Sequence, residues 1–230
     1  MFRDAVLVAG KDLRIEWRSR VATNQVLPFA VVVLVLFAFA LDPDRGILQR
    51  ATAGLFWVTV LFCALLAVQR SFAVDSADGG RDALRLSALD PAAVFLGKAS
   101  ALVAQLLALE VFLGIGVALL YDTAVDLDGT SVWEVTAALV ATAVVATIGL
   151  AAAGTLYGVL AAGLRVRETL LPLLLLPVTA PVLIGATRAF ESALEGVPGD
   201  SWPWTGLLGV FALVYTALGL VTFGSLLEES

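Results

Sequence analysis

Histidine is absent from this 230-residue chain, and cysteine and methionine occur once each. Transition metals and haem are bound largely through these three residue types, so the chain lacks the side chains for a metal or haem site with several ligands. Catalysis by a serine–histidine or cysteine–histidine pair is excluded by the same count. The single cysteine, Cys63, also excludes a disulfide within the chain.

Lysine is scarce as well, since Lys11 and Lys98 are the only two. A Walker A loop, which holds the phosphates of ATP, needs a lysine followed by serine or threonine. Lys11 is followed by Asp12 and Lys98 by Ala99, so neither fits. Any ATP that the protein uses must be bound by a partner, and we expect the chain itself not to be an enzyme. Its net charge of −6 argues against nucleic-acid binding, which needs a basic surface.

Long stretches of the chain carry few or no charged residues, and 60% of all residues are hydrophobic. A helix needs about 20 mainly apolar residues to cross a bilayer. The uncharged stretches predict six transmembrane helices, so we expect an all-α integral membrane protein in which residues 1–230 form a single transmembrane domain. The predicted spans cover approximately 25–41, 51–70, 94–121, 132–162, 169–187 and 204–227.

Basic residues are concentrated in alternate segments between these spans. Residues 1–24, the connection 70–98 and the loop 163–168 hold 11 of the 14 lysines and arginines. Because cytoplasmic segments are enriched in Lys and Arg, the pattern predicts a multi-pass protein of the cell (plasma or inner) membrane with both termini in the cytoplasm. Four aromatic residues are expected as anchors at the outer interface, namely Tyr121, Trp133, Trp202 and Trp204.

Ahead of the first span, apolar residues recur every three or four positions. This spacing places one apolar stripe along a helix, with most charged residues on the other side. The pattern predicts an amphipathic helix over residues 1–24 that lies flat at the inner membrane interface. The alternative is an ordinary cytoplasmic extension of the first span. The stripe consists of Phe2, Val6, Ala9, Leu13 and Trp17.

The connection between the second and third spans is the longest segment that we expect in the cytoplasm. Asp78-Gly79-Gly80 is a turn signal, and Asp90-Pro91 is a helix start with the aspartate as N-cap. Residues 81–89 between them are long enough for one short helix. Such a helix is either a compact loop or a lever that receives force from another protein.

Glu110 is the one charged residue in residues 99–121, which make up most of the third predicted span. A charge at the bilayer centre costs roughly 3 kcal/mol on insertion scales, so the side chain should face the bundle interior or a cavity, or be protonated. One interpretation is a role in a substrate pathway, in gating or in proton coupling. The other is a neutral carboxyl that is hydrogen-bonded to a neighbouring helix, through Thr142 or Thr147.

The fifth span contains three prolines, Pro172, Pro177 and Pro181, in the stretch "LLPLLLLPVTAPVLIGA" at 170–186. Each proline lacks a backbone N–H and frees a carbonyl four residues earlier. A membrane helix tolerates this if neighbouring helices, hydroxyls such as that of Thr179, or water satisfy the freed carbonyls. The pattern therefore favours a bundle that opens, with the prolines in its pathway or gate.

The fourth span carries small residues four positions apart, at Gly154, Gly158 and Ala162. Such a ridge lets another helix approach closely. The ridge predicts close helix packing, either within the chain or across a dimer contact.

The whole arrangement resembles the ABC-2-type (type V-like) exporter permeases. It combines the interfacial helix, the six spans, the short cytoplasmic helix and, after the fifth span, an amphipathic piece "RAFESALEGV". Within that group, three strings are similar to the haem exporter B (CcmB) family of cytochrome c maturation permeases. Asp75 and Asp82 stand where that family has glutamates, and the proline after its short helix is displaced to Pro91. The strings are "LFWVTVLFCALLAVQRSFAVDSADGGRDAL" at 55–84, "VFLGK" at 94–98 and the proline-bearing stretch at 170–186.

This resemblance implies a permease subunit that pairs with an ABC ATP-binding subunit, with two copies of each, and works with a haem-handling membrane subunit and a haem chaperone. ATP would be bound by the partner, and its hydrolysis coupled to haem export or to release of the haem-loaded chaperone. A chain without histidine offers haem only an apolar path or weak tyrosine or cysteine ligation, which favours release of the chaperone. The residues that the resemblance implies for coupling to the ATPase are Asp75, Asp78, Gly79, Arg81, Asp82, Leu84 and Arg85.

Two other functions fit the same sequence. The first is an ABC-2 permease that exports another amphiphile, such as a lipid or a drug. The second is a secondary transporter that is coupled through Glu110 and needs no ATPase. No cofactor is expected to be bound by the chain itself.

Overall fold

A computed structural model describes residues 1–20, 22–41, 45–77, 89–121, 130–162 and 167–229. Every regular element in these residues is a helix. The elements are α1 (Phe2–Ser19), the π-helical turn η1 (Ala22–Val26), α2 (Leu27–Leu41), α3 (Arg45–Ala77), α5 (Pro91–Leu120), α6 (Val132–Ala162), α7 (Arg167–Leu194), the 3-10 turn η2 (Pro198–Asp200) and α8 (Ser201–Glu229).

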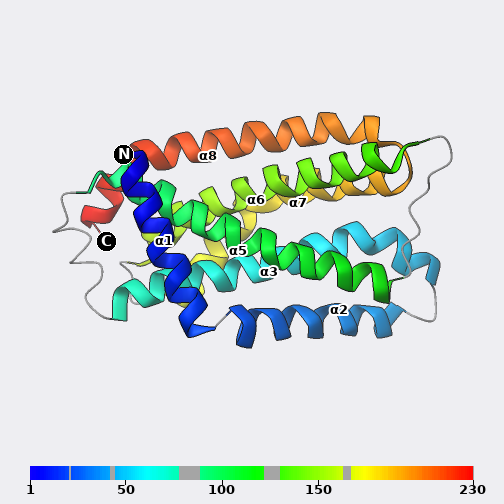
Figure 1. Ribbon diagram of the computed structural model, residues 1–230, viewed down its shortest axis with the longest axis horizontal. Helices are drawn as coiled ribbons and strands as arrows, with labels where there is room; N and C mark the ends of the chain where they lie inside the picture. Colours follow the sequence, from blue (N-terminus) through cyan, green and yellow to red (C-terminus); the bar gives the residue numbers. More distant parts are fainter. Residues whose placement is uncertain (21, 42–44, 78–88, 122–129, 163–166, 230) are drawn as a thin grey trace.

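Six of the helical segments are long and apolar enough to cross a membrane, which confirms the predicted all-α membrane protein. They run side by side along the long axis of the molecule, and α1 crosses one end of them at a steep angle (Figure 1). Both chain termini lie at this end, which we call the α1 end of the bundle. The six segments are Asn24–Leu41, Gly46–Val74, Pro91–Leu120, Val132–Ala162, Thr169–Leu194 and Pro198–Leu227.

The start of α5 follows the capping chemistry that the sequence predicts. Pro91 is the first helical residue, where its missing N–H costs nothing. Asp90 is the N-cap, and its Oδ1 accepts a hydrogen bond from the backbone N–H of Ala92 at 3.0 Å. The cap fixes the position at which α5 enters the bundle from the α1 end.

α3 and α7 exceed their predicted spans by more residues than the other helices do. α3 covers Arg45–Ala77 and not only 51–70, and α7 covers Arg167–Leu194 and not only 169–187. Residues 188–194 of the amphipathic piece therefore continue α7 and do not form a separate element. No helix breaker interrupts this part of the chain until Gly196, which adopts a left-handed φ of 78°. A change from apolar to polar composition marks where a helix leaves the hydrocarbon, not where it ends.

α1 presents its predicted apolar stripe to the outside of the protein. Phe2 and Trp17 are exposed, and Val6 and Leu13 are exposed to a smaller degree. The other side of α1 contacts α5, and Ala5 and Val8 are buried there. Since the helix lies across the bundle with an apolar face uncovered, its placement suits a helix lying in the plane of the membrane interface (Figure 1).

Tyr121 does not anchor the protein at an interface, and that prediction is wrong. Its side chain is buried, and the phenol O–H donates a hydrogen bond to the carbonyl of Leu34 at 3.2 Å. The residue thereby ties the end of α5 to the middle of α2. Trp133 and Trp202, by contrast, are exposed near the same end of the bundle.

Changing Tyr121 to phenylalanine should lower the free energy of unfolding by about 1 kcal/mol, because the buried carbonyl of Leu34 loses its extra donor. Unfolding of the purified chain in detergent, followed by circular dichroism, measures this difference. The exposed Trp133→Phe change is the control and should stay within about 0.5 kcal/mol of the parent. Equal effects of the two changes would contradict the anchoring role of the buried phenol.

Candidate functional site

α1 contacts α5 through a glycine at the α1 end of the bundle. A Cβ atom added at Gly97 would lie 2.6 Å from the Cβ of Val8 and 2.7 Å from the carbonyl oxygen of Ala5. Only glycine leaves room for the α1 backbone at this distance, as in other close helix crossings. The position of α1 on the bundle is therefore set by a residue of α5.

The next residue, Lys98, is buried with a side-chain exposure of 2%. Its Nζ lies 3.2 Å from Oδ2 of Asp12 on α1 and 5.1 Å from the centre of the Phe72 ring on α3. The other carboxylate oxygen of Asp12 pairs with Nζ of Lys11 at 2.9 Å. A buried charge needs such partners, and the ring face adds cation–π attraction. We call Asp12, Phe72, Gly97 and Lys98 the Lys98 junction.

Sequence reasoning assigned no role to this junction. The available signal was the position of Lys98, which lies about 10 Å along the helix axis from Pro91 and hence inside a predicted span. A lysine inside a membrane span requires a counter-charge, and Lys98 is one of only two lysines in the chain. The "VFLGK" string thus contains the two residues, Gly97 and Lys98, that hold α1 in place.

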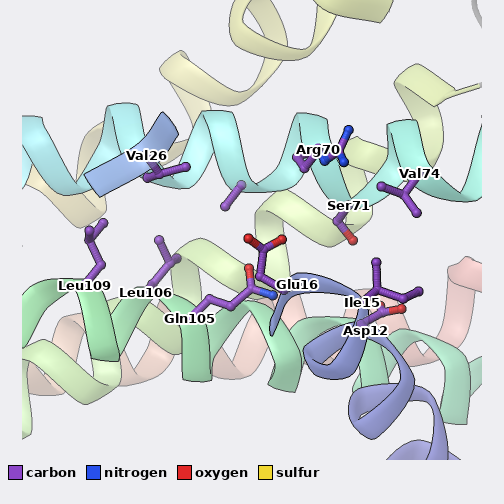
Figure 2. A pocket seen from close by; sticks show the side chains of 11 residues that line it. Asp12, Ile15, Glu16, Val26, Arg70, Ser71, Val74, Gln105, Leu106 and Leu109 are labelled. Carbon is purple, nitrogen blue, oxygen red and sulfur yellow. The ribbon is translucent and has the colours of Figure 1, made fainter. Parts of the chain in front are cut away.

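A small cavity of about 60 Å³, lined by both polar and apolar side chains, adjoins the Lys98 junction between α1, α3 and α5. Figure 2 shows the Glu16 carboxylate of α1 turned into this space, with Gln105 of α5 beside it and Ser71 of α3 on the facing helix. This volume holds a few water molecules and is too small for a large amphiphile. The cavity therefore suits hydration of the polar groups beneath α1 and not transport.

The residues implied for ATPase coupling fall almost entirely outside the described part of the chain. Asp75 belongs to the last turn of α3, which ends at Ala77. The helices on either side of the coupling segment both reach the Lys98 junction, because Phe72 lies close to the end of α3 and Lys98 close to the start of α5. The coupling residues outside the described residues are Asp78, Gly79, Arg81, Asp82, Leu84 and Arg85.

Glu110 is buried, with 6% of its surface exposed. The Thr147 hydroxyl on α6 donates a hydrogen bond to Oε1 of Glu110 at 2.5 Å. Thr142, the other threonine considered, is instead 2.7 Å from the Thr205 hydroxyl on α8. Oε2 of Glu110 has no hydrogen-bond partner among the described residues. Oε1 is thus hydrogen-bonded within the bundle, and Oε2 can form a further hydrogen bond.

All three prolines of the fifth span lie inside α7, which stays helical from Arg167 to Leu194. The Thr179 hydroxyl bonds to the carbonyls of Leu175 at 2.9 Å and Leu176 at 3.2 Å. Those carbonyls are not the ones that the prolines free, which belong to Glu168, Leu173 and Pro177. The expectation that Thr179 compensates for the prolines is therefore wrong in this structure.

The small-residue ridge of α6 faces α3. A Cβ added at Gly154 would lie 2.7 Å from Cγ2 of Val68, and one at Gly158 would collide with the Phe72 ring. Ala162, one turn further along, is also buried. Since the Phe72 ring contacts both Gly158 and Lys98, the ridge supports the aromatic wall of the Lys98 junction.

Comparison with known proteins identifies the family. The family model described as "CcmB protein" matches residues 3–229. A "Heme exporter protein B" of Paracoccus denitrificans is 30% identical over 219 residues, covering 94% of this chain and 93% of its own length. Proteins of the same name from Haemophilus influenzae and Escherichia coli are each 32% identical, over 188 and 197 residues. The first covers 82% of this chain and 81% of its own length, and the second covers 83% of both. The chain therefore belongs to the CcmB protein family.

Proposed function

We propose that this chain is the membrane permease subunit of an ATP-driven ABC transporter complex of cytochrome c biogenesis. The observation that carries the proposal is the family match over residues 3–229, together with relatives named "Heme exporter protein B". The sequence contains no Walker A loop, so ATP is bound and hydrolysed by an ATP-binding partner subunit. Two copies of each subunit would form the complex, with a haem-handling membrane subunit and a haem chaperone as further partners.

The α1 end of the bundle faces the cytoplasm in this proposal. Eleven of the 14 basic residues belong to the segments 1–24, 70–98 and 163–168, and cytoplasmic segments are the ones enriched in Lys and Arg. Both chain termini lie at the α1 end (Figure 1). An ATP-binding subunit, which works in the cytoplasm, would then meet the coupling segment between α3 and α5.

Force would pass from the coupling segment into the bundle through α3 and α5. Any displacement of Ala77 relative to Pro91 must be absorbed where the two helices share contacts, and among the side chains that the structure describes there, Lys98 is a buried charge. The ion pair with Asp12 links the same point to α1. The proline-bearing α7, which has fewer backbone hydrogen bonds than an ordinary helix, would yield more easily than its neighbours.

Of the two forms of work that the complex could do, we favour release of the haem-loaded chaperone. Direct transport of haem with axial ligation is best served by histidine, and the chain has none. Its one methionine is Met1, and the three tyrosines and the single buried cysteine would be weak ligands. A purely mechanical role needs only a bundle that changes shape. Haem is then handled by the partners and not bound by this chain.

Reversing the charges of Asp82 and Arg85 together should uncouple the ATPase. The tagged chain is purified from its native membrane, and the co-purified ATP-binding subunit and the yield of mature cytochrome c are measured. We expect the double reversal to reduce both by at least about tenfold, the loss that follows from roughly 1.4 kcal/mol of binding energy. The control is reversal of Arg188, an exposed residue at the other end of the bundle, which should change neither.

Two results would overturn the proposal. One is that the unmodified tagged chain, purified from its native membrane under mild conditions, brings down no ATP-binding subunit. The other is a charge-reversed chain that retains the normal cytochrome c yield. Transport by the purified chain alone, abolished by Glu110→Gln, would instead support a secondary transporter.

A further inference from the structure

A second cavity, of about 440 Å³, lies between α3, α5, α6 and α7, away from the α1 end of the bundle. Small residues leave this space open, because a larger side chain at Ala53, Gly114, Ala118 or Ala143 would fill part of it. The Phe56 ring, which stacks on Phe190 with the ring centres 5.3 Å apart, forms part of the wall. We call this space the Glu110 cavity.

The Glu110 cavity opens sideways between α5 and α6. Val111, Gly114 and Ala118 of α5 and Val140 of α6 line it and are also exposed on the outside of the bundle. Glu110 lies ten residues before the end of α5, about 15 Å along the helix axis. A ligand would therefore enter from the hydrocarbon of the bilayer and not from water.

Among the described residues that line the cavity, two carry polar side chains, Thr52 and Glu110. The Thr52 hydroxyl donates to the carbonyl of Leu48 at 3.0 Å within its own helix. Glu110 is more than nine-tenths buried, its Oε1 accepts from Thr147, and its Oε2 lacks a partner in the described part of the chain. A buried polar atom without a partner is costly, so this one calls for an explanation.

The surroundings decide what kind of partner Oε2 can take. In the residues that the structure describes, no basic side chain pairs with Glu110. A carboxyl in an apolar cavity with no cation beside it is stable as the neutral acid. A neutral carboxyl has one O–H to donate, and Thr147 already serves Oε1. Oε2 then presents a hydrogen-bond donor to the cavity.

We propose that the Glu110 cavity is a binding site for a compact, uncharged, membrane-soluble molecule whose carbonyl or carboxyl oxygen accepts a hydrogen bond from Glu110. Its apolar body would fill the space between α5 and α6. The site goes beyond the ATP-driven function, since it requires only the folded chain in a bilayer. A lipid acyl chain would also fill the space, but it would leave Oε2 unpaired.

Photolabelling of the purified full-length chain in lipid nanodiscs tests the site. The probe is benzophenone, an apolar ketone that attaches to nearby C–H bonds under ultraviolet light. We expect labelled peptides from residues 107–118 and 139–144. Two rigid competitors of similar shape separate hydrogen bonding from apolar filling, namely fluorenone, which has a carbonyl, and fluorene, which has none. Fluorenone should compete about tenfold better, the ratio expected for one hydrogen bond.

Three variants locate the effect. Glu110→Gln keeps both a donor and an acceptor and should retain labelling, whereas Glu110→Leu should lose the preference for fluorenone. Gly114→Leu should remove most labelling, because a side chain there meets no atom within 4 Å and projects into the open cavity. Gly206→Leu is the matched control, since Gly206 is an exposed helical glycine of α8 with equally free surroundings.

Equal competition by fluorenone and fluorene would show that the cavity only accommodates apolar chains and would overturn the proposal. Labelling that persists in Gly114→Leu would place the probe elsewhere, with the same consequence. Neither result affects the ATPase proposal, which is tested by co-purification. Conversely, a chain without an ATPase partner could still bind the ketone in the Glu110 cavity.

Discussion

Replacing Lys98 by methionine is expected to lower the free energy of unfolding by about 3 kcal/mol, near the lower end of the range for breaking a buried ion pair. Methionine has a similar length and packs easily, so the change removes chiefly the charge. The Asp12 carboxylate, whose side chain is only 10% exposed, then keeps Lys11 as its remaining lysine partner at the junction. The Phe72 ring also loses its cation. Denaturant-induced unfolding of the purified chain in detergent measures the effect.

Lys11 supplies a control within the same ion pair. Its Nζ contacts the other oxygen of the Asp12 carboxylate, but its side chain is 42% exposed. An exposed ion pair is screened by solvent, so Lys11→Met should cost no more than about 0.5 kcal/mol. Two lysines that bind one carboxylate should therefore differ several-fold in their contribution to stability. Similar losses for the two variants would contradict the assignment of Lys98 as a buried anchor.

A double change distinguishes the ion pair from simple packing. Lys98→Met combined with Asp12→Leu removes both charges, and a pair of apolar residues often replaces a buried ion pair without loss. We expect the double variant to recover most of the stability that Lys98→Met loses. If the stability lost in the double variant instead equals the sum of the losses in the two single variants, the residues act independently and the junction does not depend on their charges.

The fold was largely predictable because a bilayer imposes simple requirements. Long apolar stretches with few or no charged residues predicted all six spans, and the Asp90-Pro91 pair predicted the start of α5, where the Asp90 side chain caps the helix. The ends of α3 and α7 were not predictable from hydropathy. A helix can continue past the hydrocarbon as long as its backbone hydrogen bonds continue. Tyr121 was misplaced because burial against α2 is a tertiary contact that its position near a span end does not reveal.

The candidate sites depend on the register between helices that are distant in sequence. Lys98 and Asp12 are 86 positions apart, and nothing local links them. For Glu110, the sequence offered Thr142 and Thr147 as partners, which lie more than one helical turn apart on α6. Only the packing of α5 against α6 brings Thr147, and not Thr142, to the carboxyl. Residue types predicted the need for partners, but three-dimensional packing selected them.

Changing Gly97 to leucine should detach α1 from the bundle and lower the free energy of unfolding by about 3 kcal/mol, the upper part of the usual range for overpacking. The new Cβ would lie 2.7 Å from the Ala5 carbonyl oxygen, a backbone atom that can move only if α1 moves. Displacing α1 also separates Asp12 from Lys98, so the ion pair is lost with the packing. Hydrogen exchange of the α1 amides, measured by mass spectrometry, should become much faster while α6 stays protected.

The control is Gly10→Leu in α1 itself, where an added side chain meets no atom within 4 Å. That change replaces a glycine by a better helix former, so exchange in α1 should stay the same or slow down.

The exposed apolar stripe of α1 should keep the helix at the membrane surface even after Gly97→Leu has released it from α5. The bundle would then remain folded without its crosswise helix. If the cytochrome c yield falls in this variant while the ATP-binding subunit still co-purifies, α1 is required for transmitting force and not for assembly. An unchanged yield would show that α1 docking is dispensable for the work of the complex.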